Sequence, residues 1–126
     1  MGEIRKYNCS CGYSQELPVG VGMSGMNMLA IQRVFPEDIL AEFLKEKEKD
    51  NVETYVNKNQ LGICTHCQTL VVSPHLQYVL KDGSEKHIMG TCPDCGKEFS
   101  PINNPDDVNC PKCGKTMTSE IAGHWD

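Results

Sequence analysis

The chain has few aromatic side chains and few cations. Phe, Trp and Tyr make up 6% of its 126 residues, and Arg5 and Arg33 are its arginines. The scarcity of aromatics predicts a thin apolar core that needs additional cross-links. The sequence also lacks a basic run, and its formal net charge is −5. Nucleic-acid-binding proteins gain affinity from clustered Lys and Arg, so nucleic acid is a disfavoured partner.

From the sequence pattern we expect neither an export signal nor a membrane span. Residues 1–6 carry charge, and no apolar segment follows them. The uncharged run from Leu17 to Gln32 is interrupted by proline and several glycines and is too short to cross a bilayer. We therefore expect a cytoplasmic protein without membrane association, in a reducing compartment where disulfides rarely persist.

Against this sparse composition, the chain has eight cysteines. They fall into four close pairs, which are Cys9 and Cys11, Cys64 and Cys67, Cys92 and Cys95, and Cys110 and Cys113. In a reducing compartment such pairs indicate metal ligation, with a disulfide scaffold or free thiols as alternatives. Four thiolates from two pairs form a closed tetrahedral zinc site. The sequence therefore predicts two structural Zn²⁺ ions, with iron as the less favoured metal.

The spacing of the pairs suggests how they combine. The last two pairs have a spacing close to that of a zinc ribbon, which favours one site at Cys92, Cys95, Cys110 and Cys113. The remaining cysteines, Cys9, Cys11, Cys64 and Cys67, then make the second site. The main alternative joins Cys64 and Cys67 to Cys92 and Cys95 and leaves the two chain ends to share the other ion.

The turns themselves resemble those of a known class of protein. Cys11-Gly12-Tyr13 and the two Cys-Pro-x-Cys-Gly turns, at residues 92–96 and 110–114, are similar to the knuckles of zinc-ribbon and rubredoxin-like proteins. The resemblance implies a small β-sheet pinned by metal. Cys9-Ser10-Cys11 departs from the usual C-x-x-C. The overall layout also resembles small uncharacterised bacterial double-zinc proteins, from which no activity follows.

The predicted fold is a small, metal-stabilised α+β structure of zinc-ribbon β-hairpins with one inserted amphipathic helix at residues 36–49. Pro36 suits the first helical position, and apolar residues recur at helical spacing after it. Strands are expected at residues 4–8, 13–17, 76–80 and 86–89, and a helical turn near 28–33. Residues 51–59 are expected to be loop, with a short strand at 53–56 as the alternative. We expect two modules, an N-terminal zinc-binding module at 1–80 and a zinc ribbon at 81–126.

The sequence indicates a non-enzymatic protein. A catalytic zinc needs histidine or carboxylate ligands and a free position, whereas eight cysteines suffice for two closed sites. His66, His75, His87 and His124 are scattered along the chain. We expect an adaptor or regulator that presents the Gly- and Met-rich segment 18–32 and the helix to another protein; the oligomeric state is left open. Rubredoxin-like electron transfer, metal or redox sensing, and nucleic-acid binding remain as alternatives.

Overall fold

The computed structural model describes residues 2–22 and 26–125 of the chain. Within these residues it shows a small α+β fold with two antiparallel sheets and two helices. Residues 23–25 of the Gly- and Met-rich segment lie outside the described residues. Among the described residues, no helix combines the length and the apolar character needed to cross a membrane.

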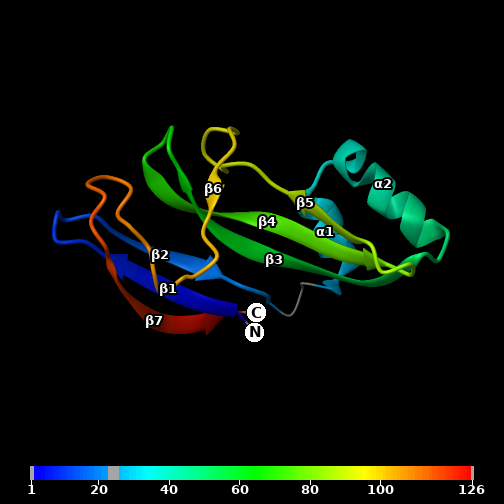
Figure 1. Ribbon diagram of the computed structural model, residues 1–126, viewed down its shortest axis with the longest axis horizontal. Coiled ribbons are helices and arrows are strands. Elements are labelled where there is room, and N and C mark those ends of the chain that lie inside the picture. Colours follow the sequence, from blue (N-terminus) through cyan, green and yellow to red (C-terminus); the bar gives the residue numbers. More distant parts are fainter. Residues whose placement is uncertain (1, 23–25, 126) are drawn as a thin grey trace.

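The first sheet joins the two ends of the chain. Its strands are β1 (Gly2–Asn8), β2 (Ser14–Val19) and β7 (Thr118–Trp125), in the order β2-β1-β7. The central strand β1 is antiparallel to both neighbours. Figure 1 shows the N- and C-termini close together at one end of this sheet.

The second sheet is built on a long hairpin. Its strands are β3 (Val52–Cys64), β4 (Thr69–Leu80), β5 (Glu85–Met89) and the short β6 (Ser100–Pro101), in the order β5-β4-β3-β6. The hairpin from β4 to β5 confirms the predicted strands and their turn at Asp82-Gly83, where Gly83 has a φ of 92°.

Strand β3 replaces the loop predicted at residues 51–59 and extends well beyond the short strand at 53–56 that was the alternative. Its middle, Asn57-Lys58-Asn59, consists of residue types that are depleted in strands. It is nevertheless paired with β4 along almost its whole length. Alternate residues, among them Tyr55 and Leu61, pack into apolar clusters. Tertiary pairing therefore overrides the local preference of this segment.

The helices are α1 (Met28–Val34) and α2 (Glu37–Glu48). The sequence predicts both, the first as a turn near 28–33, although only the second entered the predicted fold. Asn27 caps α1 by accepting hydrogen bonds from the backbone of Leu29 and Ala30. Helix α2 starts after Pro36 and buries Leu40 and Phe43.

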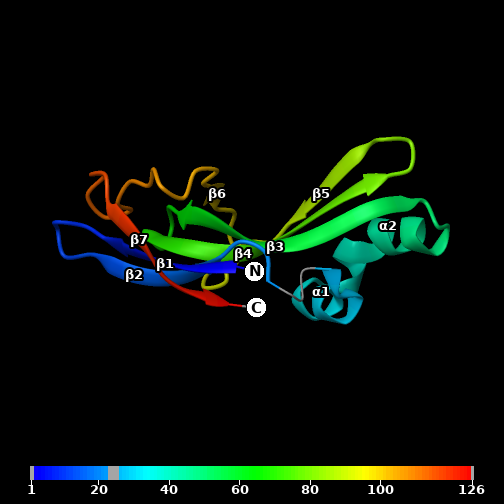
Figure 2. The same ribbon diagram turned by 90° about the horizontal axis from the view of Figure 1, so that it is seen from below.

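One face of the β3–β4 hairpin supports two separate cores. Leu70 lies in a cluster with Tyr7 and Leu17 of the first sheet, whereas Leu76 lies in a cluster with Ile31 and Phe43 of the helices. Leu70 and Leu76 lie an even number of residues apart, so they face the same side of β4. Figure 2 shows the first sheet under one half of the hairpin and the helices under the other.

The predicted division into modules 1–80 and 81–126 stays a prediction, but strand pairing crosses it. Strand β7 pairs with β1, and β5 pairs with β4. The segment before β7 is also tied to the first module, because the Tyr7 hydroxyl donates to the Pro105 carbonyl at 2.9 Å. Arg5 forms an ion pair with Asp106.

Candidate metal centres

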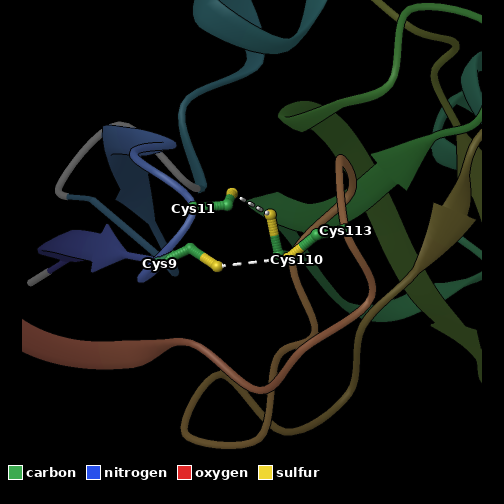
Figure 3. Close-up of side chains that lie close together, drawn as sticks. All are labelled: Cys9, Cys11, Cys110 and Cys113. Carbon is green, nitrogen blue, oxygen red and sulfur yellow. Dashed lines mark hydrogen bonds between the residues drawn. The ribbon is translucent and has the colours of Figure 1, made fainter.

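The first cluster of cysteines lies at the end of the terminal sheet. Cys9 and Cys11 are in the β1–β2 loop, and Cys110 and Cys113 are in the loop that leads to β7. Asn8, the last residue of β1, pairs with both Ser14 and Thr118, so the two loops leave the sheet at the same end. Figure 3 shows the four sulfurs converging from these loops. We call this group the terminal cluster.

The sulfurs of the terminal cluster have the separation that a tetrahedral metal requires. Sγ of Cys9 lies 3.4 Å from Sγ of Cys113, and Sγ of Cys11 lies 3.7 Å from Sγ of Cys110. All four lie within 4.8 Å of one another. Four thiolates bound tetrahedrally to zinc at about 2.3 Å lie about 3.8 Å apart. The donor set and its geometry therefore fit Zn²⁺ or another thiophilic ion.

The second cluster lies at the tip of the long hairpin. Cys64 and Cys67 belong to the β3–β4 turn, and Cys92 and Cys95 to the segment between β5 and β6. We call this group the hairpin cluster. Its Sγ atoms lie 3.6 Å apart for Cys64 and Cys95, and 4.0 Å apart for Cys67 and Cys92. These distances also fit a tetrahedral metal site.

Packing behind the hairpin cluster holds its two halves together. Cys64 and Cys92 share an apolar cluster with Val71 and Phe99. Strand β6 pairs with β3 through Gly62 and Pro101. A Cβ atom at Gly62 would overlap the Phe99 ring and lie 2.6 Å from the Ser100 carbonyl oxygen. Glycine at this position lets the segment that follows the Cys92 knuckle approach β3 closely.

The two clusters differ in their exposure to solvent. In the hairpin cluster, Cys64 and Cys92 are buried and the other two cysteines are half-buried. In the terminal cluster, Cys11 and Cys113 are exposed, and only Cys110 is buried. A metal in the terminal cluster is therefore the more accessible to chelators and oxidants.

Three of the four knuckles share a backbone hydrogen-bonding pattern. The Cys92 N–H donates to the Lys97 carbonyl, and the Gly96 N–H donates back to the Cys92 carbonyl, each at 2.9 Å. Cys110 bonds in the same way with Lys115 and Gly114. In the first knuckle, Cys9 bonds instead with Tyr13 at 2.9 Å and Gly12 at 3.0 Å. The C-x-C sequence thus forms the same turn with one residue fewer.

A left-handed residue follows the second cysteine in every knuckle. It is glycine at Gly12, Gly96 and Gly114, with φ between 75° and 101°. In the Cys64–Cys67 knuckle this position is Gln68, with a φ of 53°. Glycine adopts this left-handed conformation freely, whereas Gln68 is the position where a side chain is strained by it.

Backbone amides favour one thiolate in each cluster. The Cys67 N–H donates to Cys64 Sγ at 3.4 Å, and this bond lowers the pKa of Cys64 to about 7. A backbone hydrogen bond from Cys11 likewise lowers the pKa of Cys9 to about 7. Contact with Cys95 and burial raise the pKa of Cys67 to about 12. One thiol ionises readily and its neighbour resists, so a divalent cation is needed to stabilise all four as thiolates.

The grouping favoured by cysteine spacing is wrong. The structure joins Cys64 and Cys67 to Cys92 and Cys95, which is the alternative reading of the sequence. The β1–β7 pairing explains this outcome, because it places the Cys110 knuckle beside the Cys9 knuckle near the start of the chain. All eight predicted cysteines lie in the two clusters, and their ligation of metal stays a prediction.

The histidines lie outside both clusters, but two of them meet. His75 Nε2 lies 2.9 Å from His87 Nδ1, and His87 Nε2 lies 3.1 Å from Glu85. Burial lowers the pKa of His75, and the nearby Lys58 and His87 act in the same direction. Sequence reasoning treated these histidines as scattered. The Asp82-Gly83 turn was the available signal, because its register places residues 75 and 87 diagonally across β4 and β5.

Comparisons of the chain with protein-family models, with curated proteins and with solved structures each gave no match.

Proposed function

We propose that the two clusters are structural zinc sites of a zinc-ribbon, rubredoxin-like type. The observation that carries the proposal is the convergence of four sulfurs from two knuckles, twice, at separations that fit tetrahedral thiolate ligation. Four thiolates leave no open position for a substrate. The residues therefore support a non-enzymatic role.

The expected contribution of the metals is large compared with the stability of the chain. A structural zinc contributes apparent binding free energy of roughly 10–16 kcal/mol in small peptides, and a whole domain is stable by only about 5–15 kcal/mol. The terminal cluster would lock β1 to the Cys110 knuckle, and the hairpin cluster would lock the β3–β4 tip to the segment before β6. Each cluster joins cysteine pairs that are far apart in the chain, and a cross-link that closes a long loop stabilises the folded state most.

We further propose that this zinc-stabilised scaffold binds another protein. Several large apolar side chains are more than 40% exposed, among them Leu29, Val34, Ile39 and Met89. Val34, Ile39 and Met89 line one hollow, and an apolar patch of this kind is typical of an interaction site. The acidic charge of the chain disfavours nucleic acid as the partner.

Native mass spectrometry of protein purified without added metal tests the first proposal. We expect two zinc ions per chain and a loss of the near-ultraviolet circular dichroism signal on removal of both ions. A red, redox-active protein would identify iron and rubredoxin-like electron transfer instead. A metal-free chain with its sulfurs joined as disulfides would contradict the proposal.

Capture from host lysate tests the second proposal. Zinc-loaded protein on beads should retain a defined partner, and metal-stripped protein should lose it, because the scaffold then unfolds. A zinc-loaded protein that retains no partner would contradict the adaptor role.

A second candidate function is redox sensing at the terminal cluster, favoured by the exposure of Cys11 and Cys113. Hydrogen peroxide would take two electrons from two thiolates, which form a disulfide and release the metal while the peroxide becomes two hydroxide ions. Mild peroxide should then release one zinc well before the other. Simultaneous release would count against sensing.

A further inference from the structure

An apolar groove lies between the helices and the hairpin cluster. It has a volume of about 450 Å³. It is lined by Ser73 and Pro74 of β4, by residues 34–36 and Ile39 at the junction of the two helices, and by residues 89–93 and Gly96. The groove therefore connects three parts of the fold that are distant in sequence.

Exposed aliphatic side chains concentrate at this groove. Val34, Ile39 and Met89 line it and are 48%, 50% and 41% exposed. Pro36, Pro74 and Pro93 add rigid apolar surface. Apolar side chains that converge from separate elements on one hollow are typical of a site that receives a partner's side chains.

Two carboxylates lie in the hollows that adjoin the groove. A hollow that shares Phe35 with it is lined by Glu37, and a hollow that shares Met89 with it is lined by Glu98. Among the residues that line these three hollows, Glu37 and Glu98 are the carboxylates, and lysine and arginine are absent. Cys92 also lines the groove, and four thiolates around a divalent cation would carry a net charge of about −2.

We infer that this groove binds a peptide segment of another protein that carries aliphatic side chains beside lysine or arginine. The aliphatic groups fill the hollow, and the basic groups meet the carboxylates and the thiolate cluster at its sides. A second copy of this chain fits less well, because its net charge is −5 and it has no basic run to offer. This inference rests on the proposed protein-binding function and specifies its surface.

Selection from a random peptide library displayed on phage, against the zinc-loaded full chain, tests the inference. We expect enriched peptides that combine aliphatic residues with Lys or Arg. Ile39→Lys should weaken their binding by roughly ten-fold or more, because it removes apolar contact and adds a repelling charge. Glu98→Lys should weaken binding and reduce its salt dependence.

Ile121→Lys is the matched control, because Ile121 on β7 does not line the groove and is also 50% exposed. It should leave peptide binding unchanged, with equal zinc content and circular dichroism in all variants. Acidic enriched peptides, no enrichment, or equal binding by Ile39→Lys would overturn the inference. A wild-type dimer that Ile39→Lys dissociates would also overturn it and make the groove a self-interface.

Lysate capture separates this inference from the broader function. A partner that binds wild type and Ile39→Lys equally would contradict binding at the groove but would leave the adaptor role intact. Loss of that partner with Ile39→Lys, and its retention with Ile121→Lys, would support both the groove as the binding site and the adaptor role.

Discussion

Cys11 and Cys110 are 99 positions apart in the chain, yet their sulfurs lie 3.7 Å apart. The contact follows from the antiparallel pairing of β1 with β7, which turns the two terminal segments into neighbours. The cluster at the end of that ladder thereby links the start of the chain to its last strand.

The terminal cluster should control the stability of the terminal sheet. In Cys110→Ser/Cys113→Ser we expect the loss of one metal and faster hydrogen exchange of β7 amides, because this strand then depends on its ladder with β1 alone. Amides of β4, which lie between two other strands, should stay protected. Hydrogen exchange followed by mass spectrometry measures both.

Cys92→Ser/Cys95→Ser is the control for this prediction, because it removes the knuckle of the other cluster. It should leave β7 protected. Equal loss of protection in β7 for the two variants would show that the terminal sheet does not depend on its own cluster.

Gln68→Gly should stabilise the protein. Gln68 has a φ of 53°, a conformation that costs a side-chain-bearing residue about 1–2 kcal/mol. Glycine relieves this strain, but its greater flexibility stabilises the unfolded chain by about 0.4–1 kcal/mol. We expect a net rise in the free energy of unfolding of about 0.5–1 kcal/mol in the zinc-loaded protein, measured by urea denaturation.

Gly96→Ala provides the reverse comparison at the equivalent position of another knuckle. Gly96 has a φ of 75°, and an added Cβ would meet nothing within 4 Å, so the change tests backbone strain alone. It should lower the free energy of unfolding by about 1 kcal/mol. If Gln68→Gly is neutral while Gly96→Ala is destabilising, strain at Gln68 is relieved by some other contact.

His75 should make stability depend on pH in the mildly acidic range. Burial lowers its pKa in the folded state, so the unfolded chain takes up the proton first, at an ordinary pKa of about 6.5. The free energy of unfolding should therefore fall as pH drops below about 6.5. Above this pH His75 is neutral in both states, and the destabilisation should be absent. His75→Gln should be less sensitive to this change than wild type.

Urea denaturation at about pH 7.5 and about pH 5.5 measures the difference, and acid effects on the metal sites are common to both proteins. His124→Gln, at an exposed position of β7, is the control and should behave as wild type. An unchanged pH dependence in His75→Gln would show that this histidine is protonated equally in both states.

Local sequence signals predicted much of the fold. Pro36 and the apolar spacing after it predicted α2, and Asp82-Gly83 predicted the β4–β5 hairpin. For β3 the local signal covered only a short strand at 53–56, because the rest of the strand depends on pairing with β4 rather than on its own side chains.

The cysteines were identified from sequence, but their grouping was not. Spacing describes which sulfurs are near along the chain, whereas the grouping depends on the β1–β7 ladder. That ladder joins residues at the two ends of the chain, and the sequence carries no local signal for it. The groove could not be predicted from the sequence for the same reason, since its lining residues come from three separate segments.

Metal counting in two quadruple variants by native mass spectrometry tests the central claim most directly. The first variant replaces the whole terminal cluster by serine, at Cys9, Cys11, Cys110 and Cys113. The second replaces the last two pairs, at Cys92, Cys95, Cys110 and Cys113. The structure predicts one tightly bound zinc in the first variant and none in the second, because the second leaves half of each cluster. One zinc in the second variant and none in the first would contradict the account.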